Sequence, residues 1–116
     1  MQSGATSAAV GNVVIWMDIL EIGESIAERT LVMGAEEVVV TIGKPQPFDD
    51  GEDCFCPYSI EYAGQKKVSY AGGIDAVQAL QLSMKKIGND LAHLAKTQGV
   101  PIAWLPDAPG DTGFSD

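Results

Sequence analysis

Apolar residues between positions 75 and 99 recur at alternating spacings of three and four, which is the spacing of one face of a helix. Asp75 can accept hydrogen bonds from the first free amides, Gln78 stands three residues later to complete a capping box, and Gly99 is placed to end the helix. The pattern therefore predicts one long amphipathic helix. Its buried stripe consists of Val77, Leu80, Met84, Ile87, Leu91 and Leu94.

The segment from Ser25 to Gly43 is rich in β-branched residues on both sides of Gly34-Ala35. Glycine at the first position of a two-residue loop suits a type II′ turn, so we expect a β-hairpin with Met33 opposite Glu36. Arg29 shares the inward face, and we expect its guanidinium to reach water or an acid at the sheet margin. The register buries four aliphatic residues on that face, namely Leu31, Val38, Val40 and Ile42.

A second pair of strands is indicated on either side of Gly64. A two-residue loop at Gly64-Gln65 would turn Val68 to the polar face. We therefore expect a connection of three or five residues, bulged, with Val68 and Tyr70 on the buried face. The first strand of the pair alternates Cys56, Tyr58, Ile60 and Tyr62 with other residues.

These elements predict an α+β fold, in which an antiparallel meander sheet of four or five strands carries one long helix on one face. We expect a single domain over residues 24–105, with Val100 to Leu105 as a last strand or an extended cover. A turn-rich tail follows over residues 106–116, in which Phe114 folds back as an anchor.

Residues 1–23 are expected to form an N-terminal extension that is partly mobile or forms an interface. Its apolar run from Ala8 to Leu20 suits either a strand or a short helix, and Met17 is a candidate natural start. Leu82 lies on the polar side of the predicted helix, where it is either an ordinary exposed leucine or a subunit contact. If Leu82 and the run Val13 to Trp16 are both uncovered, a homodimer would hide them.

The balance of charges narrows the classes of partner. There are 16 acidic and 7 basic residues, which give a net charge of −9. Phosphate binding requires clustered basic residues, and only Lys66-Lys67 and Lys85-Lys86 stand together, so we expect no nucleic-acid partner. The longest nearly apolar run is too short to cross a bilayer, and the first basic residue is Arg29, which argues against a secretory signal. We therefore expect a cytoplasmic protein with no membrane partner.

An acidic loop around Gly51 is one candidate for binding chemistry. Hard cations favour oxygen clusters, but the spacing here does not match the twelve-residue calcium loop, so a turn is the simpler interpretation. An acidic surface also complements a basic protein partner. The candidate partner-binding residues are Asp49, Asp50, Glu52, Asp53 and Leu82.

The thiols and the one histidine give little support to catalysis or metal binding. A disulfide between Cys54 and Cys56 would be strained, and a zinc site would need further ligands although His93 is the only histidine. We expect free cysteines, no metal and no cofactor, with a Cys–His pair assembled across the fold as a remaining alternative. No nucleophile elbow or phosphate loop appears, and no catalytic residue is assigned.

A polar pair at the predicted helix start, beside tyrosine-bearing strands, is a candidate ligand pocket. Capping alone also explains Asp75 and Gln78 without any ligand. The candidate ligand-binding residues are Cys56, Tyr58, Tyr70, Asp75 and Gln78.

The chain resembles a family of small uncharacterised bacterial proteins over roughly Ile26 to Phe114. Its elements are an IGxP turn, a Cys-x-Tyr strand, a Gly-[Ile/Val]-Asp-x-x-Gln-Ala-Leu helix start and a Gly-Phe near the end. They correspond here to Ile42–Pro45, CPYSIEY, AGGIDAVQALQLSMKKIG with the following IAWL, and the closing GF. The resemblance implies no activity, because the family is one of unknown function.

The sequence as a whole favours a non-catalytic binding or protein-interaction domain, because carboxylates and tyrosines suit recognition while the groups needed for acid–base chemistry are scarce. The sharper form of this hypothesis is an immunity-like protein that blocks a basic partner. The alternative is a small hydrolase or ligand-dependent enzyme with a pocket near Cys56, Asp75 and Gln78.

Overall fold

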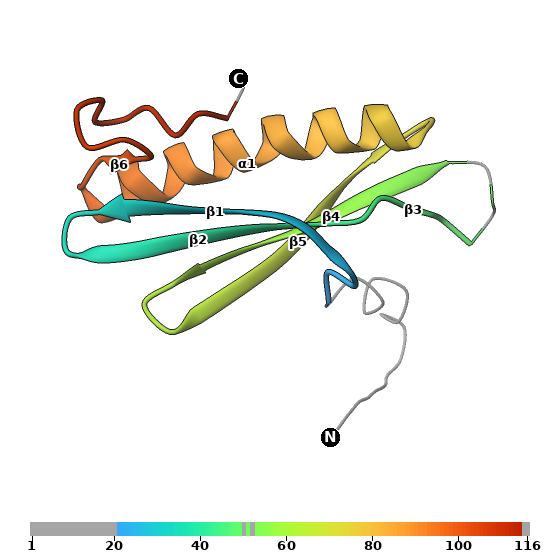
Figure 1. The fold of residues 1–116 in the computed structure, drawn as a ribbon, viewed down its shortest axis with the longest axis horizontal. Helices are drawn as coiled ribbons and strands as arrows, with labels where there is room; N and C mark the ends of the chain where they lie inside the picture. Colours follow the sequence, from blue (N-terminus) through green and yellow to red (C-terminus); the bar gives the residue numbers. More distant parts are fainter. Residues whose placement is uncertain (1–20, 50, 52, 115–116) are drawn as a thin grey trace.

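The computed structural model describes residues 21–49, 51 and 53–114, and within them it has two layers, an antiparallel sheet and one helix across it (Figure 1). The predicted α+β class and the meander are confirmed. The spatial strand order is β6-β1-β2-β4-β5, and β3 pairs with β4 beyond the end of β2. The elements are β1 (Ser25–Met33), β2 (Glu36–Gly43), β3 (Gln46–Pro47), β4 (Cys54–Tyr62), β5 (Gln65–Gly73), α1 (Ala76–Gln98) and β6 (Ile102–Ala103).

The β1–β2 hairpin has the predicted register. Met33 pairs with Glu36 and Leu31 with Val38. Gly34 has a φ of 65°, and Ala35 is not among the residues with positive φ, as a type II′ turn requires. The inward face of the hairpin is buried as expected, at Leu31, Val38, Val40 and Ile42.

The β4–β5 hairpin corrects the sequence-based prediction. Its loop is the two residues Ala63 and Gly64, with φ values of 52° and 80°, which indicates a type I′ turn without a bulge. Val68 therefore lies opposite Ser59. Val68 and Tyr70 face away from the helix, so their predicted place in the core was wrong. The error arose because Val68 and Tyr70 were assumed to lie on the buried face, which requires a loop with an odd number of residues, whereas the observed loop has two.

The helix starts and ends where its sequence signals lie. The Asp75 carboxylate accepts from the Gln78 amide at 2.8 Å, and the Gln78 side chain accepts from the Ile74 amide at 2.8 Å. Gly99, with a φ of 72°, donates its amide to Ala95 and ends the helix. Within the described residues, no helix combines the length and apolar character needed to span a membrane.

The buried face of α1 is rotated from the predicted stripe. Val77 is 63% exposed, so its predicted burial was wrong, whereas Ala79 and Ser83 are fully buried together with the predicted Ile87 and Leu91. A Cβ on Gly73 would lie 2.5 Å from the Ala79 amide nitrogen. The end of β5 thus approaches the first turn of α1 so closely that only small residues fit between them.

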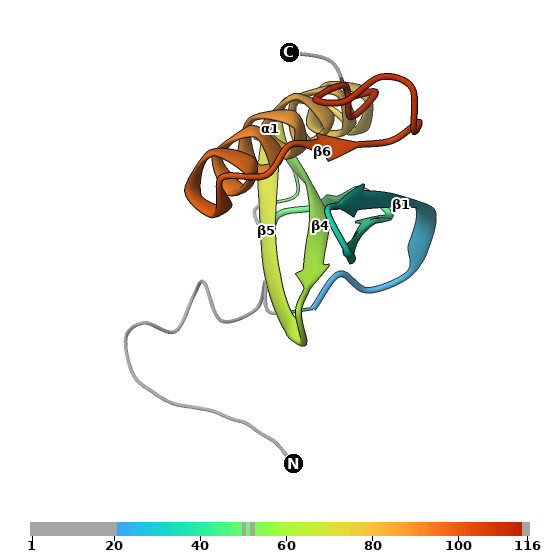
Figure 2. The same cartoon turned by 90° about the vertical axis from the view of Figure 1, so that its left-hand side faces the viewer.

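The helix lies over β4 and β5, while β6 and the tail cover the β1 side of the sheet (Figure 2). Phe114 is half-buried against the core, as the anchor prediction expected. The guanidinium of Arg29 stacks on Trp104, 3.7 Å from the ring centroid, and donates to the Thr112 carbonyl at 3.1 Å. Arg29 is half-buried, and its guanidinium contacts an aromatic ring and a carbonyl instead of the acid that the prediction allowed. The run Val13 to Trp16 lies outside the described residues.

Candidate ligand-binding groove

Two tyrosines on the inward face of β4 connect the sheet to the second half of α1. The Tyr58 hydroxyl donates to an oxygen of Asp90, and the Tyr62 hydroxyl donates to Gln98 Oε1 at 3.0 Å. Tyr58 and Tyr62 are four residues apart on β4, which is about 13 Å along a strand, and Asp90 and Gln98 are eight residues apart on α1, which is about 12 Å along a helix. The spacing on the strand therefore matches the spacing on the helix. We call these two hydrogen bonds the tyrosine links.

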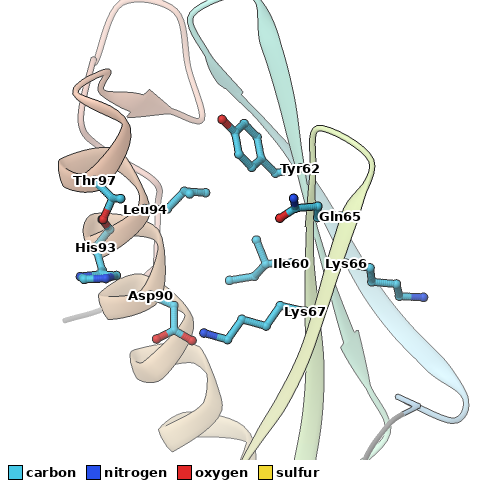
Figure 3. A pocket seen from close by; sticks show the side chains of 9 residues that line it. All are labelled: Ile60, Tyr62, Gln65, Lys66, Lys67, Asp90, His93, Leu94 and Thr97. Carbon is cyan, nitrogen blue, oxygen red and sulfur yellow. The ribbon is translucent and has the colours of Figure 1, made fainter.

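A groove of about 280 Å³ lies between the helix and the β4–β5 hairpin, along the stretch that the tyrosine links bound. Ile60 is midway between the two tyrosines, Leu94 is midway between Asp90 and Gln98, and their side chains point toward each other (Figure 3). The lining residues are Ile60, Tyr62, Gln65, Lys66, Lys67, Asp90, His93, Leu94 and Thr97.

Charged groups of both signs stand at the mouth of the groove. The Lys67 side chain extends from β5 toward Asp90 on α1, whereas Lys66 points away from the groove (Figure 3). Burial, followed by the hydrogen bond to Asp90, raises the pKa of Tyr58 above its ordinary value. The phenol therefore keeps its proton at neutral pH and acts as the donor to Asp90.

The thiol of Cys56 is part of the core. Cys56 is fully buried, and this burial raises the pKa of its thiol, although a hydrogen bond with Ser83 acts in the opposite direction. The Ser83 hydroxyl donates to the Cys56 carbonyl at 2.6 Å and accepts from the Ala71 amide at 3.1 Å. A buried, protonated thiol lacks the reactivity of a nucleophile.

The predicted ligand-binding residues lie in three separate places. Cys56 and Tyr58 are beneath the helix, and Tyr58 reaches the groove only through Asp90. Tyr70 is on the opposite face of the sheet, in a cluster with Phe48 and Phe55. The remaining two, Asp75 and Gln78, are exposed and form the helix cap.

Of the predicted partner-binding residues, the three that the structure describes, Asp49, Asp53 and Leu82, do not line the groove. Asp49 and Asp53 are exposed on the β3–β4 loop, which is held by a 2.9 Å bond from the Phe48 amide to the Asp53 carbonyl and by ring packing of Phe48 on Phe55. Leu82 is 41% exposed on α1. In the part of the chain that the structure describes, no three His, Cys, Asp or Glu side chains are close enough to share a metal ion. Asp50 and Glu52 lie outside the described residues.

Sequence reasoning missed Asp90, Leu94 and Lys67 as members of one site. One signal was present, because Asp90 is three residues after Ile87 and four before Leu94, which places a carboxylate on the buried side of the helix. A partly buried carboxylate needs a donor, and Tyr58 on the facing strand provides it.

The described residues form a small two-layer α+β domain with a groove at the boundary between the sheet and the helix. The chain belongs to the DUF6968 family, described as a domain of unknown function, whose model matches residues 27–115. No curated protein and no solved structure matches the chain. All residues that line the groove fall within the matched segment.

Proposed function

We propose that this protein is a non-catalytic, cytoplasmic binding domain whose groove receives a side chain of a protein partner. The observation that carries the proposal is the groove itself, with Ile60 and Leu94 inside and Lys67 and Asp90 at its mouth. Ligand sites combine apolar walls with a few placed polar groups in this way. A volume of about 280 Å³ is at the small end for a metabolite or cofactor site and suits one or two side chains.

The placement of the polar groups supports binding over the enzyme alternative. That alternative needs Cys56, Asp75 and Gln78 to converge on one pocket. Cys56 is instead buried in the core, and the other two side chains satisfy backbone amides at the helix start. Tyr58 holds Asp90 in place through a protonated phenol, an arrangement that orients a carboxylate for recognition.

The acidic loop is a second candidate surface, for a basic partner. Asp49 and Asp53 are exposed on a loop whose backbone is held by hydrogen bonds and by the Phe48–Phe55 contact, and an acidic surface complements a basic partner. This surface supports the immunity-like form of the proposal. A homodimer through Leu82 is a further proposal, supported by the exposure of that leucine.

An affinity capture from cell lysate with matched leucine variants tests the proposal. Leu94→Gln adds a polar group inside the groove, whereas Leu82→Gln makes the same change on the solvent side of the same helix. We expect wild type and Leu82→Gln to enrich the same protein, and Leu94→Gln to lose it. Circular dichroism of each variant confirms that the fold is retained.

The other outcomes of the capture have definite meanings. Loss of the partner in Leu82→Gln alone would place the interface on the outer side of α1. Loss only on charge reversal at Asp49 and Asp53 would place it on the acidic loop. No specific partner, together with a metabolite that raises the melting temperature, would overturn the binding proposal in favour of the enzyme alternative.

A further inference from the structure

The outer edge of β5 is a sheet edge, and in the described residues only part of it is hydrogen-bonded. β5 pairs only with β4. Tyr62 and Gln65 flank the two-residue loop and form a hydrogen-bonded pair, so every second residue from Gln65 onward, the odd-numbered ones, directs its amide and carbonyl to β4. The backbone groups of Lys66, Val68 and Tyr70 point outward. Lys86 Nζ donates to the Tyr70 carbonyl at 2.9 Å, but within the described residues the backbone groups of Lys66 and Val68 have no partner.

This free edge runs beside the groove. Lys67 lies between the two outward residues and lines the groove, as does Gln65 (Figure 3). An extended segment paired with Lys66 and Val68 would therefore place alternate side chains on the α1 side of the sheet, next to Leu94. Edges of this kind bind extended segments by adding a strand, with main-chain bonds for affinity and side-chain pockets for specificity.

The net positive charge along the β5 edge favours an acidic partner segment. Three of the six lysines, Lys66, Lys67 and Lys86, stand along this edge in a chain with a net charge of −9. Two acids face them, Glu61 across the strand from Lys66 and Asp90 across the groove from Lys67, so a net positive charge remains. A second copy of β5 would bring lysines close to lysines, and like charges across a strand pair are destabilising.

We propose that the protein partner binds as an added β-strand on the outer edge of β5, through an extended acidic segment that places one apolar side chain in the groove. This inference rests on the proposed function, because the groove is the receiving site. The acidic side chains pair with Lys66 and Lys67, and the partner backbone bonds to the amide and carbonyl of Val68.

A phage-displayed library of random heptapeptides, panned on the full chain, supplies the probe. We expect enriched peptides to combine Asp or Glu, on both faces of the added strand, with β-branched residues. For a synthetic peptide of the enriched sequence, Val68→Pro should raise the Kd at least tenfold, because proline removes the outward N–H without touching the bonds to β4. Val68→Ala, which keeps the amide, should stay within twofold of wild type.

A backbone change in the peptide gives a second measurement that leaves the protein intact. N-methylation at one set of alternate peptide residues should raise the Kd at least tenfold, and methylation at the other set should not. An enriched peptide that is sensitive to Leu94→Gln but to neither backbone change would overturn strand addition and leave the proposed function standing. A basic consensus would overturn the acidic segment, and a library that yields no peptide sensitive to Leu94→Gln would overturn the proposed function itself.

Discussion

Removing the hydroxyl of Ser83 tests how α1 is joined to the sheet. Ser83 is fully buried, and its hydroxyl bridges the Cys56 carbonyl and the Ala71 amide, two groups that lie opposite each other on β4 and β5. In Ser83→Ala both backbone groups lose this partner, the Cys56 carbonyl in the buried core and the Ala71 amide in a partly buried position. A net hydrogen bond contributes about 1 kcal/mol and an unsatisfied buried group costs about 1–3 kcal/mol, so we expect a loss of roughly 2–3 kcal/mol in the free energy of unfolding.

Urea denaturation of wild type and Ser83→Ala measures this loss, with an unchanged slope as the check that the unfolded states are comparable. Thr97→Ala is the matched control, because the exposed Thr97 hydroxyl bonds only to the His93 carbonyl of its own helix, and it should change stability by less than about 0.5 kcal/mol. A loss below about 0.5 kcal/mol in Ser83→Ala would refute the reasoning, since the strands would then be pairing directly without the hydroxyl.

Two further predictions concern the helix face and the tyrosine links. Ile87→Ala should cost about 2–5 kcal/mol in chemical denaturation whereas Val77→Ala should cost less than about 0.5 kcal/mol, and similar losses would contradict the rotated helix face. Folding raises the pKa of Tyr58 above the value of about 10 that it has in the unfolded chain. Its contribution to the free energy of unfolding is therefore fully present below about pH 10 and is lost as the pH rises beyond that value. Between pH 8 and pH 11 wild type should therefore lose about 1.4 kcal/mol more than Tyr58→Phe, and equal losses would count against the raised pKa that burial and the Asp90 bond give Tyr58.

The first hairpin and the helix ends could be predicted because their determinants are local. Gly34 at the start of a two-residue loop sets the β1–β2 register, and Asp75 with Gln78 sets the helix start. The second register was wrong because Val68 and Tyr70 were taken as buried residues, which requires an odd loop, whereas the loop consists of the two residues Ala63 and Gly64. A change of one residue in the length of this loop sends Val68 and Tyr70 to the other face of the sheet.

The candidate groove depends on an alignment between distant elements, so sequence spacing alone could not define it. Its walls are 34 residues apart in the chain at Ile60 and Leu94, and they meet because α1 runs along β4 with two tyrosine links of matching length. The helix turns its small residues Ala79 and Ser83 toward the sheet because β5 approaches it closely at Gly73. The spacing of hydrophobic residues along the helix does not reveal this approach.

Amide chemical-shift mapping on the ¹⁵N-labelled chain, with an enriched acidic heptapeptide added in steps, tests most directly that the groove and the β5 edge form the binding site. We predict that the largest shifts fall on Lys66, Val68 and Leu94, on the two sides of the groove. Largest shifts at Asp49 and Asp53 on the acidic loop, or around Leu82 on the outer side of α1, would contradict it.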